Sequence, residues 1–334
     1  MKVAINGFGR IGKLVFRAFL EKNLKGVEIV AINELGSLDS SLHLMQFDSI
    51  HGKLPVEIKK TSKGLKYKNK EIKFFSERDP KNLPWKQLKV DVVLECSGVF
   101  ASKEKASSHL IAGAKKVIIS APGSNVDATI VQGVNNNILK STHNVISNGS
   151  CTTNCLAPVA MVLDKNVGIE SGFMTTIHSY TGDQRTVDQT HSDLRRARGA
   201  AISMIPTSTG AAKALSLVLP KLKGRLDGTA IRVPTPNVSL IDFTFTSKKK
   251  TSVEKINNFV SKAAKSKQLK NILTTNNLPL VSIDFNHNPA SAIVDGSLTN
   301  VVGDNMGKIS AWYDNEWGFS NRMCDIAEFI HQNS

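Results

Sequence analysis

Short apolar runs alternate with helix-like segments over the first half of the chain. Five runs, each closed by Gly, Ser, Asn or Pro, cover residues 2–5, 27–32, 90–95, 117–120 and 145–147. After the first run, Ile11, Leu14, Val15, Ala18 and Phe19 recur at the spacing of one helical face. Strands that alternate with helices form parallel sheets through right-handed crossovers. We therefore expect an α/β domain with a doubly wound parallel sheet over residues 1–150.

The pattern changes after about residue 150. Longer strand-like runs fall at 173–177, 230–233, 239–246 and 308–312, with further helices near 210–219 and 252–266. Longer strands with fewer helices between them favour a mixed or antiparallel sheet, so residues 151–316 are predicted to form an α+β domain. Met323, Ile326, Ala327 and Ile330 are helically spaced, which predicts a final helix over 317–334.

The composition is typical of a globular protein and excludes several other classes. Of 334 residues, 41% are hydrophobic and 21% charged, which excludes collagen, disorder and coiled coil. No apolar run approaches the roughly 18 residues that cross a bilayer. Residues 1–10 resemble a strand and turn rather than a signal peptide. The four cysteines have neither disulfide-framework nor zinc-finger spacing, so we expect a cytoplasmic protein with reduced thiols and no metal site.

The charge balance is strongly basic, because 43 Lys and Arg against 28 Asp and Glu give a net charge of +15. Lysines gather at 53–73 and at 248–270. In the second stretch Thr251 and Glu254 have capping-box spacing, and apolar residues form one helical face opposite the lysines. We interpret both stretches as solvated faces of amphipathic elements. Binding of nucleic acid, another anionic polymer or a host protein is the alternative that such a surface leaves open.

A glycine motif lies between the first predicted strand and the helix that follows it. Residues 6–12, NGFGRIG, contain G-x-G-x-x-G at Gly7, Gly9 and Gly12. Glycine permits a tight turn and lets the backbone approach a pyrophosphate at the helix N-terminus. Glu34 follows the second strand, 22 residues after Gly12, where an acid binds ribose hydroxyls and repels a 2′-phosphate. This context predicts a Rossmann site for NAD; glycines that serve only close packing are the alternative.

Cys151 is the candidate nucleophile. Apolar residues at helical spacing follow it, so it is expected at a helix N-terminus, where a neighbouring imidazolium would lower its pKa further. His178 follows the strand at 173–177 and is expected beside it. Without such a neighbour, a structural role would be the better interpretation of Cys151. Cys155 is predicted to face the interior, and Cys96 and Cys324 to lie in the core. The other histidines are predicted in polar or surface-like contexts: His43, His51, His109, His143, His191, His287 and His331.

Nine segments together resemble phosphorylating glyceraldehyde-3-phosphate dehydrogenase, in that family's order. They are NGFGRIG (6–12), ERDPKNLPW (77–85), ISAPG (119–123), SNGSCTTNCLAP (147–158), HSYTGDQ (178–184), RRARGAA (195–201), IPTSTGAAKA (205–214), RVPTPNVS (232–239) and WYDNEWGFSNR (312–322). The resemblance implies a homotetramer of subunits that have a Rossmann domain at 1–150 and a catalytic domain at 151–316. It also implies that the helix at 317–334 packs back onto the first domain.

The same resemblance implies the glycolytic oxidation of glyceraldehyde 3-phosphate to 1,3-bisphosphoglycerate with NAD and inorganic phosphate. Cys151 would form a hemithioacetal and then a thioester, with His178 as the base. The implied cofactor residues are Asn6, Gly7, Gly9, Arg10, Ile11, Gly12, Glu34, Arg78, Ser120 and Asn315. Thr181 and Arg232 would hold the substrate phosphate. The attacking-phosphate site would comprise Ser150, Thr152, Arg196, Thr209 and Gly210.

Some choices stay open. Arg195 and Arg198 flank Arg196, whose alternative role is an intersubunit or surface ion pair. Glu34 stands where the family ordinarily has Asp, and Gln189-Thr190 where many NAD-dependent members have a Gly-Pro or Leu-Pro pair. Two sister activities are alternatives: erythrose-4-phosphate dehydrogenase, and more distantly a semialdehyde dehydrogenase of amino-acid synthesis.

Overall fold

The computed structural model describes residues 1–333, and the chain folds into two compact units. Unit 1 comprises Met1–Ile130, Asn136–Gly149 and the chain from Ser320 onward, whereas unit 2 comprises Val131–Asn135 and Ser150–Phe319. The last residue of the expected final helix, Ser334, lies outside the described residues. Within residues 1–333, no helix combines the length and apolar character that crossing a bilayer requires.

Unit 1 is built on a nine-stranded sheet of order β10-β11-β9-β8-β1-β2-β7-β6-β5. The strands from β10 to β7 pair in parallel, which confirms the expected doubly wound fold class. The strands are β1 Lys2–Asn6, β2 Glu28–Asn33, β5 Lys59–Thr61, β6 Gly64–Tyr67, β7 Lys70–Phe75, β8 Val92–Glu95, β9 Lys116–Ile119, β10 Ala128–Thr129 and β11 Val145–Ser147. A separate small ribbon pairs β3 Phe47–Asp48 with β4 Gly52–Lys53.

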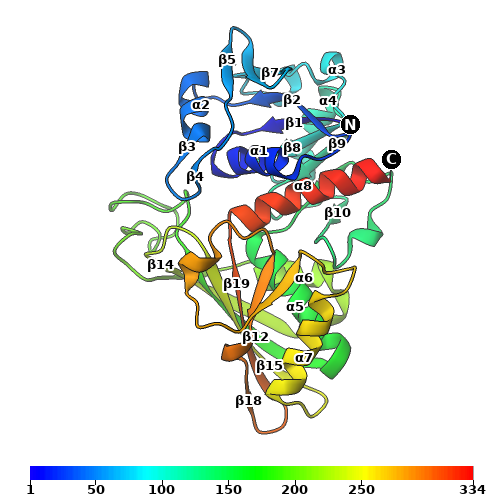
Figure 1. Ribbon diagram of the computed structural model, residues 1–334, viewed down its shortest axis with the longest axis vertical. Helices are drawn as coiled ribbons and strands as arrows, with labels where there is room; N and C mark the ends of the chain where they lie inside the picture. The colour runs from blue at the N-terminus through cyan, green and yellow to red at the C-terminus, as the bar shows by residue number, and fades with distance from the viewer. Residues whose placement is uncertain (334) are drawn as a thin grey trace. The chain divides into compact units, whose positions relative to one another are not determined.

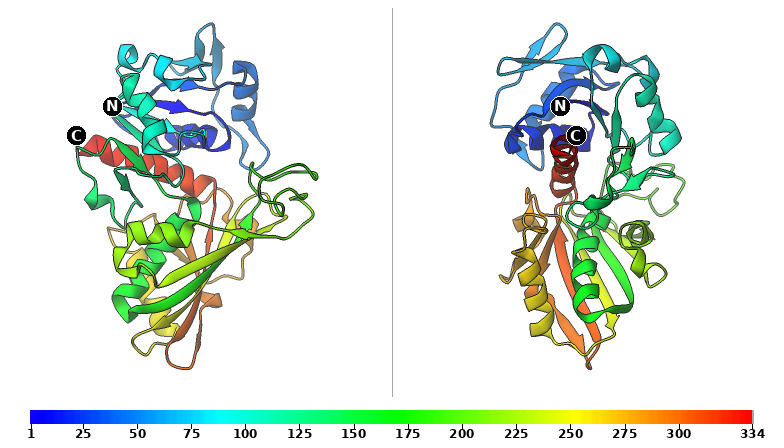
Figure 2. Two further views of the ribbon diagram at one scale, coloured as in Figure 1. Left: turned by 180° about the vertical axis from the view of Figure 1, so that it is seen from behind. Right: turned by 90° about the vertical axis from the view of Figure 1, so that its right-hand side faces the viewer.

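Helices pack on both faces of this sheet (Figures 1 and 2). They are α1 Arg10–Lys22, α2 Leu38–Gln46, α3 Trp85–Leu88, α4 Lys103–Ile111 and the part of α8 Trp317–Gln332 that belongs to unit 1. Within the unit, Cys324 Sγ of α8 lies 3.7 Å from the carbonyl oxygen of Val15 in α1, so these two helices pack together. The carboxyl ends of the parallel strands β1, β2 and β8 meet at one edge, where doubly wound sheets bind ligands.

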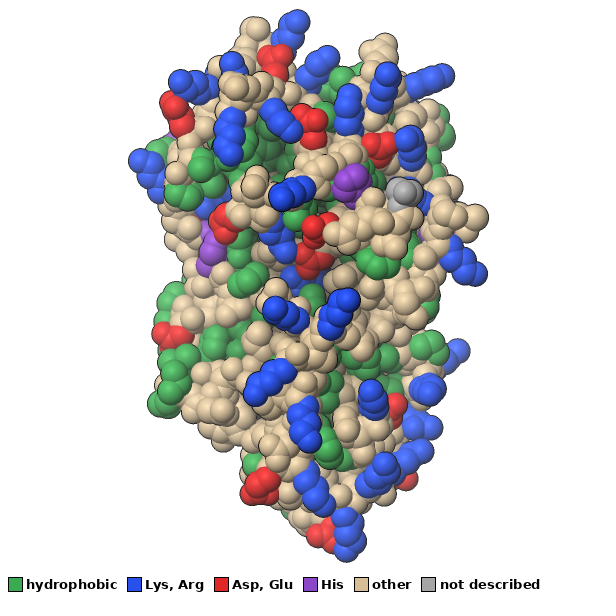
Figure 3. Space-filling model, turned by 45° about the vertical axis from the view of Figure 1, so that its right-hand side comes forward, with side chains coloured by type: hydrophobic (Ala, Val, Ile, Leu, Met, Phe, Trp, Pro, Cys, Tyr) green, Lys and Arg blue, Asp and Glu red, His purple; other side chains and the backbone are tan. Residues whose placement is uncertain are grey.

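The lysine-rich stretch at 53–73 forms antiparallel pairs at the sheet edge, β5 with β6 and β6 with β7. Leu65 and Ile72 are buried while the lysines are exposed, which confirms an amphipathic element with a solvated face. Several lysines pair with acids at the surface, for example Lys60 with Asp39 at 2.7 Å. Lysine and arginine side chains are spread widely over the face drawn in Figure 3, with fewer acidic ones between them.

Unit 2 contains the expected mixed sheet, of order β13-β14-β12-β15-β19-β17-β16, with β18 paired to β19. The strands are β12 Ile169–Ser179, β13 Ile205–Ser208, β14 Leu226–Val233, β15 Ser239–Ser247, β16 Leu273–Asn276, β17 Ala292–Asp295, β18 Asn300–Val302 and β19 Met306–Tyr313. Helices α5 Cys151–Val167, α6 Ala211–Val218 and α7 Val253–Ala264 share one hydrophobic core with β12, β15, β17 and β19. Every second residue of β15 faces this core, including Ile241, Phe243 and Phe245.

Two local predictions are wrong. Ser252, rather than Thr251, caps α7, because its hydroxyl accepts the Lys255 amide while Thr251 is buried. His109 is fully buried in unit 1 rather than surface-like. Its ring nitrogens lie 3.0 Å from Trp85 Nε1 and 3.0 Å from Glu95 Oε2, so tertiary partners satisfy a side chain whose sequence neighbours are polar.

Candidate active site

Cys151 is the first residue of α5, and the structure brings His178 to it. Ser150 caps the helix by accepting the Thr153 amide at 3.1 Å. The Cys151 sulfur lies 3.5 Å from His178 Nε2. His178, near the end of the long strand β12, is only 4% exposed. A nucleophile and a base thus lie within reach of proton transfer in unit 2.

The hydrogen bonds around the His178 ring select its tautomer. Nδ1 lies 2.6 Å from the carbonyl oxygen of Ser179, which is an acceptor only. Nδ1 therefore carries the proton, and the Nε2 lone pair faces the thiol. Arg232 Nη1 also lies 2.9 Å from Nδ1 but does not require it as an acceptor, because its two N–H groups donate to the same carbonyl at 3.1 Å and to Thr181 Oγ1 at 3.2 Å. The ring is oriented as a general base toward Cys151.

Both members of the pair are neutral at rest. Burial raises the pKa of the Cys151 thiol, against the opposing effects of the Arg232 guanidinium and the amides of Cys151 and Thr152. Burial, together with the charge of Arg232, lowers the pKa of His178 to about 3. The expected imidazolium is therefore wrong for this structure. Desolvation outweighs the helix N-terminus, so the thiol must lose its proton to His178 as it attacks.

Replacing Arg232 by glutamine is expected to move the pH profile of Cys151 alkylation to higher pH. The Arg232 charge lowers the pKa of Cys151 and of His178, so both pKa values rise without it. Only the thiolate reacts with iodoacetamide. The increase of the alkylation rate with pH should therefore have its midpoint at higher pH in the variant than in the wild type. Arg225→Gln is the matched control, since Arg225 Nη1 contacts the Ile169 carbonyl oxygen instead. A midpoint that moved to lower pH would contradict this electrostatic role of Arg232.

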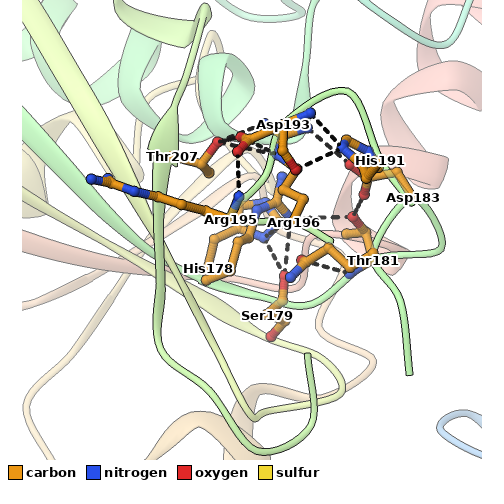
Figure 4. A network of polar contacts seen from close by, with 11 residues as sticks. His178, Ser179, Thr181, Asp183, His191, Asp193, Arg195, Arg196 and Thr207 are labelled. Atoms are coloured by element: carbon orange, nitrogen blue, oxygen red, sulfur yellow. Dashed lines mark hydrogen bonds and ion pairs between the residues drawn. The ribbon is translucent and has the colours of Figure 1, made fainter. Parts of the chain in front are cut away.

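The residues expected to hold the substrate phosphate lie together. Arg232 Nη1 donates to Thr181 Oγ1 at 3.2 Å, directly beside His178. Asp183, which was not predicted, accepts a hydrogen bond from Thr181 Oγ1 and forms an ion pair with Arg196 Nη1 at 3.0 Å. Figure 4 shows Thr181 and Asp183 in one network with Arg196, Asp193 and Thr207. The TGDQ motif held the only sequence signal for Asp183.

Arg196 is the arginine of its cluster whose guanidinium enters this network, whereas Arg195 joins it through its backbone amide, which donates to Asp193 at 2.9 Å. Arg196 Nε and Nη2 lie 3.1 and 3.0 Å from Thr207 Oγ1, and its Nε lies 3.4 Å from Asp193. Arg195 and Arg198 are both exposed, and Arg198 pairs with Asp188 at 2.8 Å. Thr209 and Gly210 follow Thr207 and begin α6, where Thr209 Oγ1 accepts the Ala211 amide at 3.2 Å. The Arg196 guanidinium thus lies against β13, and Thr209 and Gly210 connect this strand to α6.

Thr152 follows Cys151 in the first turn of α5. Its side chain is buried, and its hydroxyl lies 2.9 Å from the Tyr313 hydroxyl, which also lies 2.7 Å from Thr176 Oγ1. The Thr152 hydroxyl oxygen also lies 4.0 Å from the Cys151 sulfur, so Thr152 contacts both the nucleophile and the buried Tyr313. Tyr313 was missed, although it belongs to the quoted YDNEWG motif. Its ring meets that of His178 edge-on at 6.0 Å.

Unit 1 contains a cavity of about 310 Å³ at the carboxyl edge of its sheet. Its lining residues include Asn6, Gly7, Gly9, Glu34, Arg78 and Cys96. Cys96 is thus half-buried at the cavity wall, which corrects its expected place in the core. A larger cavity of about 660 Å³ in unit 2, beside Phe173 and Leu226, contains none of the predicted site residues.

The glycine loop fits a dinucleotide. Gly7 has φ +84°, and a Cβ there would lie 2.5 Å from the Ser97 backbone. A Cβ on Gly12 would lie 2.1 Å from the Gly7 carbonyl oxygen, so these glycines permit the turn and the packing of α1. Gly9 has nothing within 4 Å of its Cβ position. That open cradle at the start of α1 is the space that a pyrophosphate needs.

The other expected cofactor residues have diverse surroundings. Glu34 accepts the Phe8 amide at 2.6 Å and the Gly36 amide at 3.1 Å. The Arg10 side chain pairs with Asp48 at 2.5 Å, while Ile11 lies in the first turn of α1. Ser120 follows β9, and its amide donates to the Glu95 carbonyl oxygen at 2.9 Å. Asn315 belongs to unit 2, where its Oδ1 accepts the Ser239 hydroxyl at 2.9 Å. Within residues 1–333, no His, Cys, Asp and Glu cluster could hold a metal ion.

Two family models match the chain. Residues 1–103 match the model described as glyceraldehyde 3-phosphate dehydrogenase, NAD binding domain, and residues 150–315 match that of the C-terminal domain of the same family. Curated relatives match over nearly the whole chain. A glyceraldehyde-3-phosphate dehydrogenase of Xanthobacter flavus is 57% identical over 327 residues, covering 98% of this chain and 97% of the relative. Relatives with that name from Cupriavidus necator and Zymomonas mobilis are 56% and 53% identical, with the same coverage.

Proposed function

The chain belongs to the glyceraldehyde-3-phosphate dehydrogenase family, and from this premise we propose that Cys151 and His178 carry its reaction. It is an NAD-dependent oxidoreductase of glycolysis that acts on glyceraldehyde 3-phosphate. The observation that carries the site assignment is the 3.5 Å approach of the Cys151 sulfur to the unprotonated Nε2 of His178. The comparisons do not favour erythrose-4-phosphate oxidation or a binding role for the basic surface.

The reaction follows from this pair. His178 takes the thiol proton as Cys151 attacks the aldehyde, and returns it to the oxygen of the resulting hemithioacetal. Bound NAD supplies the hydride acceptor. His178 takes the hydroxyl proton as the hydride is lost from the former aldehyde carbon, which leaves a thioester on Cys151. Inorganic phosphate attacks the thioester carbonyl, and the Cys151 thiolate leaves as 1,3-bisphosphoglycerate forms. The thiolate then regains its proton from His178.

Two anion sites flank the pair. Arg232 and Thr181 hold the substrate phosphate, since a guanidinium and a hydroxyl meet there beside the base. Arg196, Thr209 and Gly210 hold the attacking phosphate, together with Ser150 and the backbone amide of Thr152. The ion pairs of Arg196 with Asp183 and Asp193 orient its guanidinium for this purpose.

Unit 1 supplies the residues proposed for the cofactor, with the single addition of Asn315 from unit 2. The glycine loop holds the pyrophosphate through residues 6–12. When NAD binds, the Glu34 carboxylate accepts hydrogen bonds from the adenosine ribose hydroxyls in place of the Phe8 and Gly36 amides. Arg78 and Ser120 complete the site. The Ser239 hydroxyl fixes the amide of Asn315, because it donates to Oδ1 and leaves Nδ2 as a donor for the nicotinamide carboxamide. We assign residues 1–150 with the helix at 317–334 to NAD binding, and 151–316 to catalysis.

A homotetramer in the cytoplasm completes the proposal. Four apolar side chains of the segment between β12 and β13 are 72–86% exposed: Val187, Leu194, Ile202 and Met204. Large apolar side chains exposed along one segment favour an association surface there, and the same segment carries Gln189 and Thr190. The cysteines are free, and a thiol nucleophile needs the reducing conditions of that compartment.

The test is reduction of NAD by glyceraldehyde 3-phosphate with and without inorganic phosphate, in the wild type and in Arg196→Gln. Removing a charge-assisted contact weakens anion binding, so the KM for phosphate should rise about 10- to 100-fold. The first-turnover burst should persist, because thioester formation precedes phosphate attack. Erythrose 4-phosphate is assayed in parallel and should be the poorer substrate.

Arg198→Gln is the matched control, since Arg198 is exposed and pairs with Asp188. Its phosphate KM should equal that of the wild type. Wild-type turnover that is indifferent to phosphate would contradict the proposed mechanism. An effect of Arg198→Gln without one of Arg196→Gln would contradict the assignment of Arg196.

A further inference from the structure

A carboxylate that the reaction does not use is buried beneath the cavity of unit 1. Glu95, the last residue of β8, is 1% exposed. Burying an ionised carboxylate is costly unless it is fully hydrogen-bonded. Here Oε2 accepts from Asn6 Nδ2 at 2.6 Å and contacts His109 Nε2 at 3.0 Å, while Oε1 accepts the Ser97 amide at 2.8 Å and the Ser97 hydroxyl. Four donors surround one carboxylate.

The direction of the His109 hydrogen bonds is fixed by Trp85. An indole N–H is a donor only, and Trp85 Nε1 lies 3.0 Å from His109 Nδ1. Nδ1 is therefore the acceptor, so the ring proton resides on Nε2 and is donated to Glu95. Trp85 thus directs the Nε2–H of His109 toward the carboxylate. The ring belongs to α4 and is 0% exposed, so water does not compete for these contacts.

The network continues from Glu95 to the cavity wall. Since Asn6 donates to Glu95, its Oδ1 is turned to accept Asn33 Nδ2 at 2.8 Å. Asn33 also receives the Glu77 amide at 2.9 Å and donates to the Glu77 carbonyl oxygen at 2.9 Å. The network ties the carboxyl ends of β1, β2 and β8 to the segment after β7. Asn6, Asn33, Glu77, Arg78 and Ser97 all line the cavity.

We propose that Glu95, held by His109, is a positioning residue that sets the shape of the site for the adenosine half of NAD. It acts through Asn6, Asn33 and Ser97. The assignment to the adenosine half follows from Glu34, the ribose-binding acid in the wall of the same cavity. The proposal rests on this cavity being the NAD site, but not on the roles of Cys151 and His178.

Glu95→Gln tests the proposal, because the amide has the same shape as the carboxylate. All four neighbours of Glu95 are donors, so the new NH₂ group must face another donor in either orientation. The contacts to Asn6, Ser97 or His109 must therefore rearrange. We expect NAD and ADP-ribose to bind about tenfold more weakly, from the loss of one or two buried hydrogen bonds. Nicotinamide mononucleotide, as a competitive inhibitor, should bind as in the wild type.

The remaining readouts separate positioning from a general loss of structure. The KM for NAD should rise while kcat at saturating NAD stays within about twofold, since no contact to the reacting atoms changes. Cys151 should react with iodoacetamide at the wild-type rate. Asp325→Asn is the control, because Asp325 forms ion pairs at 2.6 Å with Lys22 and 2.7 Å with Arg322 in unit 1. It should lower the melting temperature without changing NAD affinity.

A second pair of variants keeps the test decisive if Glu95→Gln folds poorly. His109→Gln retains an acceptor for Trp85 and a donor for Glu95, so NAD and ADP-ribose affinity should be kept. His109→Leu removes both and should weaken ADP-ribose binding. Equal affinity in the two His109 variants, or equal weakening of ADP-ribose and nicotinamide mononucleotide, would overturn the proposal. If the wild type oxidised no glyceraldehyde 3-phosphate but its NAD binding still depended on Glu95, the proposed function would fail while the role of Glu95 was supported.

Discussion

Cys151→Ser is expected to reduce kcat for glyceraldehyde 3-phosphate by about 10⁴-fold or more, the usual effect of removing a nucleophile. Serine retains the shape of the side chain, so α5 and its Ser150 cap are unchanged. Its hydroxyl is much harder to deprotonate than a thiol, so the same base activates it far less well. Steady-state and single-turnover production of NADH measure the loss.

Cys155→Ser is the matched control on the same helix. Cys155 is fully buried, with its sulfur 3.9 Å from the Ala311 carbonyl oxygen. It should lower stability while activity and the burst persist. Iodoacetamide should label one reactive thiol per subunit in the wild type and in Cys155→Ser, but none in Cys151→Ser. Turnover retained by Cys151→Ser would show that the nucleophile is another group.

His178→Asn is expected to lower kcat by about 10²- to 10⁴-fold, the contribution of a positioned general base. Asparagine keeps a donor near the Ser179 carbonyl oxygen but offers no lone pair to the thiol. Both the attack and the loss of hydride then lack a proton acceptor. Substrate deuterated at the aldehyde carbon should show a primary isotope effect on the first turnover, because hydride loss becomes limiting.

His287→Asn makes the same replacement elsewhere in unit 2. His287 has φ +64°, a left-handed conformation that asparagine tolerates, and its ring stacks on Trp317 at 3.8 Å. Its kcat should match that of the wild type. A His178→Asn variant with normal burst kinetics would exclude His178 as the base.

The sheet of unit 1 could be predicted closely because its central strands are buried on both faces and are therefore continuous apolar runs. The run at 145–147 coincides with β11, and the run at 2–5 differs from β1 by one residue. Unit 2 was harder. The strand β13 was missed because it contains Pro206 and exposed Ser208; it lies at the sheet edge, where proline is tolerated. The strand β12 begins before its apolar run, with exposed Glu170 and Ser171.

In the candidate site, too, some residues could be placed from the sequence and others could not. Cys151 and His178 could be placed because each lies near the end of an element that its own sequence specifies. His109 could not, since its burial depends on Trp85 and Glu95, which are 24 and 14 residues away. Cys96 follows an apolar strand like a core residue, yet the chain turns at the cavity there. The neutral state of the Cys151–His178 pair depends on desolvation, which is a property of the folded chain alone.

Asp183 and Asp193 hold the Arg196 guanidinium in place before any anion arrives. An arginine side chain loses up to about 2 kcal/mol of rotamer freedom when it is immobilised, and here that loss occurs during folding rather than during binding. An incoming anion must, however, displace or share two carboxylates to reach the same N–H groups. Because the guanidinium is already in place, we expect an anion to bind quickly. Because the two carboxylates compete for the same N–H groups, we expect it also to dissociate quickly. With Arg196 in its proposed role at the attacking-phosphate site, we expect the rate to follow the supply of phosphate instead of saturating at trace concentrations.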